Sequence, residues 1–204
     1  MKGQRMIIAT TTEYGTDEDT ETCGRLTRSI MDSYMRRPSV EDHAVRKIVV
    51  MAGNDASMIQ AGSHKPPMYD AALILINRNF CRFLISGSAA SYHFEEGTLA
   101  HRSDPAEASV IGSGPRYEPR LEPAFQLRPA KNAFLTASRS FAQRVSDQDI
   151  EQALQQSQSP EEWMERLKAL AGPDTHFCAV AAFLPMAKPS FLDGLGGLLR
   201  HRGK

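Results

Sequence analysis

Residue types that usually carry chemistry are present in this chain, but most of them lack the spacing that chemistry requires. The six histidines form no H-x-x-x-H or H-x-H pair, and the three cysteines form no C-x-x-C pair. We therefore expect neither a zinc site nor a disulfide framework, and we expect Cys23, Cys81 and Cys178 to be reduced thiols packed beside apolar residues. The sequence has no G-x-S-x-G elbow, no P-loop, and no G-x-G-x-x-G between a strand and a helix.

An acidic cluster offers one alternative site. Asp17, Glu18, Asp19 and Glu21 stand close together shortly after Glu13. The cluster lacks the central glycine and terminal glutamate of a calcium loop. Acidic residues also favour the first turn of a helix, where they compensate its dipole. We interpret the cluster as a solvated helix start, and keep as an alternative a displaced metal site built from Glu13 and the residues of this cluster.

Composition limits the classes of function. The 204 residues include 24 Lys and Arg against 24 Asp and Glu, and 41% are hydrophobic. This length fits one domain, and a balanced charge argues against a general nucleic-acid or anionic-membrane binder. The sequence contains no run of about 18 apolar residues, so we expect no transmembrane segment. The first residues lack the apolar core of a secretory signal, so we expect a cytoplasmic protein.

The elements that must position any site begin with a strand over residues 6–11. Leu26, Ile30 and Tyr34 recur every four residues and predict a helix that ends near Met35. A second helix is expected over residues 39–52. Short apolar runs separated by brief polar turns then predict an antiparallel meander, because such turns cannot carry parallel crossovers; its strands are 71–76, 80–85, 91–94 and 98–100.

The second half of the chain begins with an irregular, proline-rich connection over residues 112–129. A strand over 133–137 follows it. Two helices are expected next, over 146–156 and 159–171, the second with Trp163, Leu167 and Leu170 on its apolar face. A buried strand is expected over 177–184. This order predicts an α+β architecture with helices outside stacked sheets.

The last residues differ from the rest. We place a domain over residues 1–184 and a separate basic tail rich in glycine and leucine over residues 185–204. Its glycines disfavour a helix by about 1 kcal/mol each. A loosely packed tail is the main interpretation, with a docking helix or a membrane-surface segment as the alternatives.

Several stretches in order resemble the metal-dependent protein phosphatases of type 2C. Ser86–Tyr92, with the sequence SGSAASY, resembles the family's v-G-D-S-R-a-Y. Phe134–Ile150 resembles f-L-L-c-S-D-G-L followed by v-S-D-e-e-I, and Gly172–Val180 resembles the family's D-N-i-T and last strand. Ala9–Asp17 matches v-A-D-G-m-G-G-h in position only. The resemblance covers most of residues 6–184.

This resemblance implies a fold of two stacked antiparallel β-sheets flanked by helices on both faces, an α-β-β-α sandwich trimmed at its N-terminus. The family pattern opens with an arginine and an acidic N-x-D segment that have no equivalent here. The family holds two divalent ions on a cluster of aspartates, and these ions activate a hydroxide that attacks phosphorus. Magnesium and manganese need several carboxylate oxygens.

Most of these aspartates are replaced. The early Asp-Gly aspartate falls on Thr12, beside Glu13; the S-D-G aspartate falls on Arg139; the D-N aspartate is kept as Asp174, with Thr175 after it. The resemblance thus implies a relict pocket without catalytic residues, made of Thr12, Glu13, Ser88, Ser138, Arg139, Asp174 and Thr175.

Arg139 decides the expected chemistry. A guanidinium about 4 Å from a divalent ion repels it by roughly 8 kcal/mol at an effective dielectric of about 20. We therefore expect no bound metal and no cofactor, with Asp174, Glu13 and Asp17 as weak candidates for magnesium or manganese ligands. Two roles remain open for Arg139: an ion pair with Asp174 that closes the pocket, or binding of a phosphate together with Ser138, Ser140 and Thr12.

The expected function is that of a bacterial-type pseudophosphatase, a catalytically inactive type 2C-like domain with a protein-binding or regulatory role in signalling. By analogy with the family's substrates, its partner is a kinase or a phosphoprotein. Two alternatives remain open: an atypical active magnesium- or manganese-dependent serine/threonine phosphatase, and a structural interaction domain that works through its tail.

Overall fold

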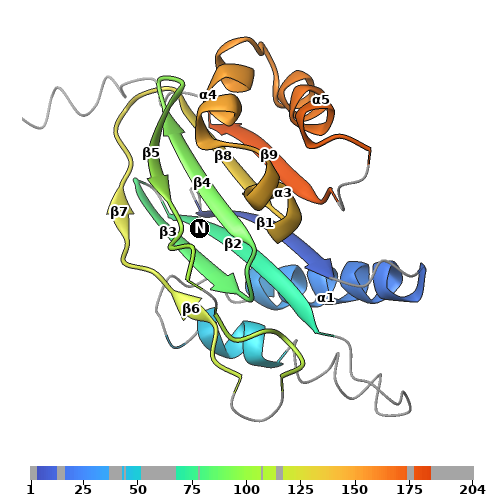
Figure 1. Ribbon diagram of the computed structural model, residues 1–204. Coiled ribbons are helices and arrows are strands. Elements are labelled where there is room, and N and C mark those ends of the chain that lie inside the picture. Colours follow the sequence, from blue (N-terminus) through green and yellow to red (C-terminus); the bar gives the residue numbers. More distant parts are fainter. Residues whose placement is uncertain are drawn as a thin grey trace, which may run out of the picture.

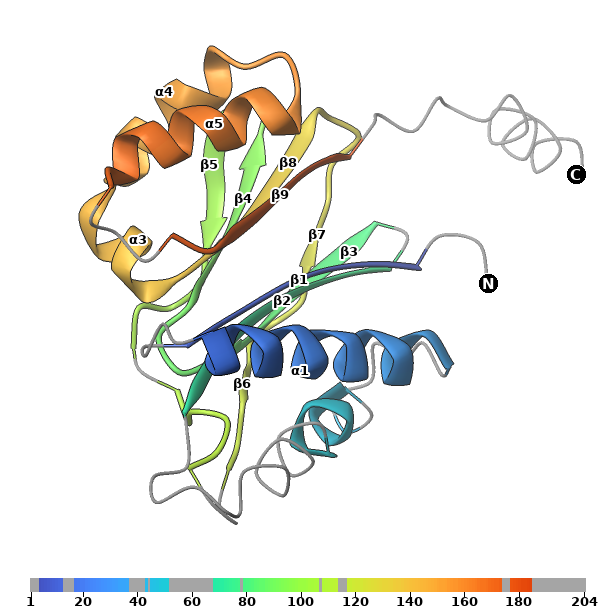
Figure 2. The ribbon, with the colours of Figure 1, turned by 90° about the vertical axis from the view of Figure 1, so that its right-hand side faces the viewer.

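The computed structural model describes residues 4–12, 17–36, 43, 45–51, 68–77, 79–106, 108–113, 117–173 and 177–184. These residues form two stacked β-sheets with helices on both outer faces, as Figures 1 and 2 show. The predicted α-β-β-α sandwich is confirmed. Within the described residues, no helix is both long enough and apolar enough to cross a bilayer.

Sheet A is antiparallel, with strand order β1-β2-β3-β6 and with β7 also paired to β3. Its strands are β1 (Gln4–Thr12), β2 (Tyr69–Asn77), β3 (Phe80–Ser86), β6 (Arg120–Leu121) and β7 (Phe125–Gln126). Side chains of β2 alternate between the two faces, as a pleated strand requires. Leu73 and Leu75 pack among the residues of helix α1 (Asp17–Arg36), while Ile74 and Ile76 face the second sheet.

Sheet B has the order β5-β4-β8-β9 and is also antiparallel throughout. Its strands are β4 (Ala90–Glu95), β5 (Thr98–Arg102), β8 (Asn132–Ala137) and β9 (Ala179–Leu184). Every residue of the central strand β8 is buried. Phe134 of β8 packs between the two sheets, whereas Leu135 packs beneath the outer helices.

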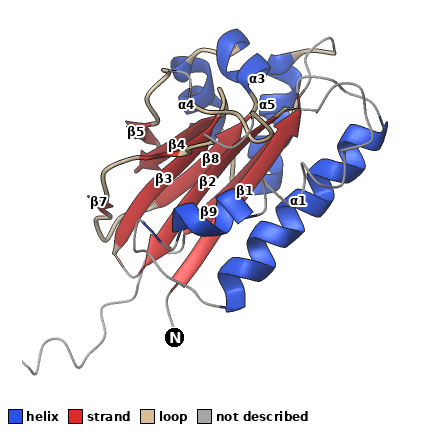
Figure 3. Ribbon diagram, turned by 90° about the horizontal axis from the view of Figure 1, so that it is seen from below, coloured by secondary structure: helices blue, strands red, loops and turns tan. Residues whose placement is uncertain are grey.

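The helices follow the predicted apolar faces with one exception. Leu26, Ile30 and Tyr34 of α1 are buried against sheet A, and Figure 3, a view from below, shows α1 running alongside the strands next to β1. Residues 45–51 of the second predicted helix are helical. On sheet B lie α3 (Arg139–Arg144), α4 (Asp147–Gln155) and α5 (Pro160–Ala171).

Helix α5 begins where the sequence predicts. The hydroxyl of Ser159 accepts a hydrogen bond from the backbone N–H of Glu162 at 3.2 Å, and Pro160 takes the first helical position. Trp163 and Leu167 are fully buried. The prediction for Leu170 is wrong, because Leu170 is 45% exposed and Ala171, four residues after Leu167, takes the buried position instead.

Other predicted elements also differ from those in the structure. The short helix α3 was not predicted, and the irregular connection over 112–129 contains the two-residue strands β6 and β7. Strand β9 begins at Ala179, two residues later than expected. The proposed tail, residues 185–204, lies outside the described residues, so the two-part division of the chain stays a prediction.

Candidate functional site

Four chain segments meet at one end of the sandwich. The last residue of β1, Thr12, stands opposite Tyr69 at the start of β2. Ser86 at the end of β3 stands opposite Ala71 of β2. On sheet B, Ala90 at the start of β4 stands opposite Ala137 at the end of β8. The β3–β4 turn and the start of α3 therefore lie close to the C-terminal end of β1.

Hydrogen bonds through Cys178 join the two sheets at this end. The thiol donates to the carbonyl of Thr10 at 3.3 Å, and the carbonyl of Cys178 accepts from the backbone N–H of Ser138 at 2.9 Å. Burial raises the pKa of the Cys178 thiol. Ser138, which is 4% exposed and precedes α3, is thus fixed relative to β1.

The turn between β3 and β4 approaches a buried carboxylate. Gly87 has φ +70°, and a Cβ atom there would lie 1.6 Å from Oδ1 of Asp70. Asp70 is buried near the start of β2 and was not among the predicted site residues. The available signal was an acidic residue directly before an uninterrupted apolar strand. Glycine is needed here both for its backbone angle and for the space it leaves.

The segment after β5 packs over this turn. The backbone N–H of Gly87 donates to Ser109, and that of Ala108 donates to the carbonyl of Gly87, at 2.9 and 3.0 Å. Ser103 is buried, and its hydroxyl accepts from the backbone N–H of Ser91 at 3.0 Å. The guanidinium of Arg120 donates to two carbonyls of the same segment. These bonds fix one wall of a cleft.

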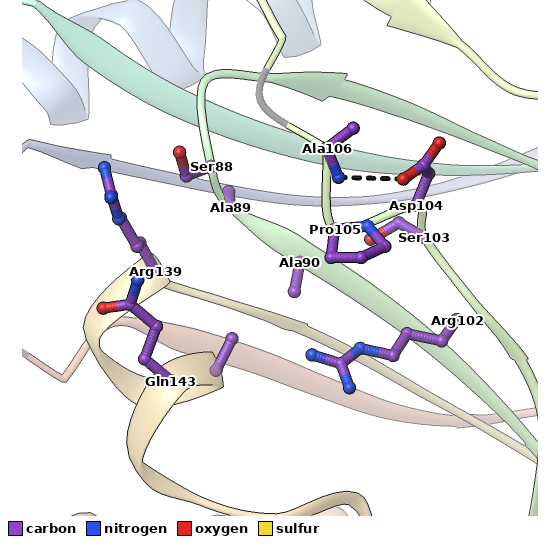
Figure 4. Close-up of a pocket in the computed structure, with 11 residues that line it drawn as sticks. Ser88, Ala89, Ala90, Arg102, Ser103, Asp104, Pro105, Ala106, Arg139 and Gln143 are labelled. Carbon is purple, nitrogen blue, oxygen red and sulfur yellow. Dashed lines mark hydrogen bonds between the residues drawn. The ribbon is translucent and has the colours of Figure 1, made fainter.

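The cleft has a volume of about 210 Å³. Figure 4 shows Arg102 and Arg139 approaching it from different sides, with Ser88 above Arg139. Ser103 and Asp104 come from the segment after β5, and Gln143 comes from α3. An Oδ1 atom of Asp104 accepts from the backbone N–H of Ala106 at 2.8 Å, the bond drawn in Figure 4.

Arg102 is held by two neighbours. Its Nη1 lies 2.8 Å from both carboxylate oxygens of Asp147, at the first turn of α4. Its guanidinium lies 5.3 Å from the centroid of the Tyr92 ring, within the range of a cation–π contact. Burial raises the pKa of Tyr92 to about 12, with the Arg102 charge opposing and the Asp147 charge adding to this shift.

Arg139 is the first residue of α3; it is exposed and lines the cleft. The hydroxyl of Ser138 is 3.3 Å from that of Ser140. Of the predicted pocket residues, the structure thus brings Ser88 and Arg139 into one cleft, with Ser138 beside it and Thr12 at the same end of the sandwich. Arg102, Ser103, Asp104 and Gln143 were not predicted, because their place in the cleft depends on long-range packing.

The remaining candidates are not located. Glu13, Asp174 and Thr175 lie outside the described residues, so the ion pair between Arg139 and Asp174 stays a prediction. Asp17 is the first residue of α1. Across the described ranges, no three His, Cys, Asp or Glu side chains are grouped as metal ligands would be. The described lining of the cleft has two guanidinium groups and a single carboxylate, a donor set that does not fit a hard divalent cation.

Comparisons with known proteins agree with this architecture. The catalytic domain of the serine/threonine protein phosphatase PstP, solved in complex with two manganese ions, superposes with a TM-score of 0.70 at 16% identity, covering 90% of this chain and 88% of PstP. A bacterial serine phosphatase superposes with a TM-score of 0.75 at 13% identity, covering 91% and 88%. The serine/threonine phosphatase of S. agalactiae gives 0.71 at 14% identity, covering 88% and 87%.

No protein-family model matches the sequence, and no curated protein matches it. These comparisons therefore show a likeness of fold alone. The chain has the fold of the catalytic domains of bacterial type 2C serine/threonine phosphatases.

Proposed function

We propose that this chain is a pseudophosphatase: a phosphatase-fold domain that binds a phosphorylated protein segment in the cleft and does not hydrolyse it. The observation that carries the proposal is Arg139. It stands where the resemblance puts a metal-ligating aspartate, and it lines the cleft at the end of β8.

Loss of catalysis follows from charge. Asp104 is the only carboxylate among the described residues that line the cleft, and it already accepts a backbone hydrogen bond. A guanidinium at a metal position removes one ligand and repels the ion by several kcal/mol. The metal-activated hydroxide of the type 2C mechanism therefore has no support from these side chains.

Binding of a phosphate follows from the same charge. The guanidinium of an arginine can donate two parallel hydrogen bonds to the oxygens of one phosphate, and nearby hydroxyl groups can donate further hydrogen bonds. Arg139 and the hydroxyl of Ser88 supply such donors, while Asp147 holds Arg102 in place at the opposite side. The cleft, at about 210 Å³, is smaller than pockets for whole small-molecule ligands, and it suits one side-chain phosphate. Because the solved structures of this fold are named serine or serine/threonine phosphatases, the ligand is a phosphoserine or phosphothreonine segment.

Calorimetry of the full chain tests both parts of this proposal. The titrants are a phosphoserine peptide and its unphosphorylated form, with and without manganese, and released phosphate is measured in parallel. We expect the phosphoserine peptide to bind and the unphosphorylated peptide not to bind. We expect no release of phosphate, with or without manganese. Arg139→Gln weakens binding at least about tenfold, since a hydrogen bond to a charged group contributes roughly 1.5–3 kcal/mol.

Arg144→Gln is the matched control, because Arg144 belongs to the same helix but does not line the cleft. Manganese-dependent release of phosphate would contradict the proposal and favour an active phosphatase. Equal affinity for both peptides, unchanged in Arg139→Gln, would also contradict it and favour an interaction domain without phosphate recognition.

A further inference from the structure

A second, larger groove lies at the opposite end of sheet B. Strand β8 runs from Asn132, which lines this groove, to Ala137, next to the cleft. The groove has a volume of about 640 Å³, in the range of pockets that hold a ligand. Its floor is apolar, formed by Ala133, Leu154, Phe183 and Leu184, and its rim carries Glu96 and Lys131.

The walls of the groove are fixed by hydrogen bonds. The amide of Gln155, at the end of α4, donates to the carbonyl of Gly97 at 3.2 Å. Glu96 and Lys131 exchange two bonds of 2.9 Å, one between backbones and one from the backbone N–H of Lys131 to the Glu96 carboxylate. Figure 1 shows the β4–β5 turn and α4 together at this end of the sheet. The groove is therefore formed before any occupant binds.

The sequence supplies an occupant of matching chemistry. Leu184 lines the groove and ends β9, and residues 185–204 follow it directly. Besides Met186, which lies close to Leu184 in the chain, this segment contains five large apolar side chains: Phe191, Leu192, Leu195, Leu198 and Leu199. The six residues before Phe191 span up to about 20 Å when extended, enough to return the segment to the groove.

Net charge favours contact between this segment and the rest of the chain. Residues 185–204 contain four Lys or Arg and one Asp, for a net charge of +3. Because the whole chain has 24 of each sign, residues 1–184 contain 20 Lys and Arg against 23 Asp and Glu, for a net charge of −3. A short tether also gives the segment a local concentration on the order of millimolar, far above that of a second molecule.

We propose that this groove binds residues 185–204 of the same chain, with the leucines of that segment on the apolar floor. Docking covers Phe183 and Leu184, which are partly exposed, and removes five apolar side chains from water. This site is separate from the cleft, and neither proposal depends on the other.

Paramagnetic relaxation in the full chain tests the proposal. A spin label is attached at Gln156→Cys, an exposed position beside the groove on the α4 side, and the tail methyl groups of Leu195 and Leu198 are observed by NMR. The background carries Cys178→Ser, because Cys23 and Cys81 are buried while Cys178 is not fully so. The matched control places the label at Arg25→Cys on α1, on the other outer face of the sandwich.

We expect strong broadening of the tail signals from the Gln156 label, independent of protein concentration, and none from the Arg25 label. Leu195→Asp removes the broadening at Leu198 without touching any described core residue. Absence of broadening, or equal broadening from both labels, would overturn the proposal. Broadening that appears between labelled and unlabelled chains in a mixture would assign the groove to a second copy and would also overturn it.

Discussion

The thiol of Cys178 donates a hydrogen bond to the carbonyl oxygen of Thr10, 3.3 Å away, and so joins the two sheets. Thr10 lies in β1 of sheet A, and Cys178 directly precedes β9 of sheet B. The hydroxyl of Thr10 also donates to the carbonyl of Cys23 on α1. Thr10 thus links three layers of the sandwich, namely α1, sheet A and sheet B. This link lies next to the start of α3 and Arg139.

Substitution of Cys178 tests this link. Cys178→Ser keeps a donor for the Thr10 carbonyl, whereas Cys178→Ala removes it. We expect Cys178→Ala to lower the free energy of unfolding by about 1 kcal/mol, the net contribution of one hydrogen bond, and Cys178→Ser to lower it less. Urea denaturation measures both. Equal losses in the two variants would show that packing, and not the hydrogen bond, sets the contribution of Cys178.

Gly87 provides a sharper test of the candidate site. A Cβ atom at this position would meet the Asp70 carboxylate at 1.6 Å, in addition to the cost of φ +70°. Gly97 has a similar φ of +83°, but a Cβ there meets only the flexible side chain of Gln155 at 3.3 Å. We expect Gly97→Ala to cost about 1–2 kcal/mol for the backbone alone, and Gly87→Ala to cost clearly more.

Thermal denaturation of the two glycine variants gives the comparison. If Gly87→Ala were no more destabilising than Gly97→Ala, the close approach of Asp70 to the turn would be wrong. Asp70→Ala in the Gly87→Ala background should recover part of the loss, because it removes the clashing carboxylate.

A stacked cluster of imidazole and phenyl rings predicts acid sensitivity. His101 stacks on Phe125 with ring centroids 3.9 Å apart, and His93 stacks on the same ring at 5.3 Å. His93 is buried, and its Nε2 donates to Oδ1 of Asn132 at 2.7 Å, since the Asn132 amide nitrogen donates to two carbonyls. Its Nδ1 has no hydrogen-bond partner. A second proton on the His93 ring would therefore have no acceptor, whereas His101 is exposed at the edge of the stack.

Burial lowers the pKa of His93 and that of His101, with the nearby Glu95 opposing both shifts. The unfolded chain then binds protons at a higher pH than the folded chain does. The free energy of unfolding should be greatest above about pH 6.5 and fall as the pH drops below that value. His93→Gln should flatten this dependence, as urea titrations at several pH values would show. An unchanged slope in that variant would contradict the assignment.

Local rules predicted much of the fold. The i, i+4 spacing of Leu26, Ile30 and Tyr34 identifies the buried face of α1, and the Ser159-Pro160 signal identifies the start of α5. Both depend on residues close together in the chain. The same rules placed Leu170 on the buried face, because leucine is larger and more apolar than alanine. In the structure the neighbouring Ala171 points more directly at the sheet and is buried, while Leu170 is exposed.

The candidate site was predicted only in part, for a physical reason. Ser88, Ser138 and Arg139 follow from motifs that sit at strand ends. Arg102 could not be assigned to the cleft from its sequence context, because its position is set by Asp147, 45 residues later. The cleft wall depends in the same way on long-range bonds from Arg120 and Ser109. Such contacts leave no periodic signal in the sequence.

In the proposed function, the guanidinium of Arg139 excludes metal from the place where the type 2C resemblance puts a metal-ligating aspartate. An anomalous difference map from crystals of the full chain grown with manganese tests this exclusion. We predict no manganese peak between Ser88, Ser138 and Arg139, and an ordered Arg139 side chain beside the cleft. Two manganese peaks at that end of the sandwich would show that Arg139 does not exclude metal.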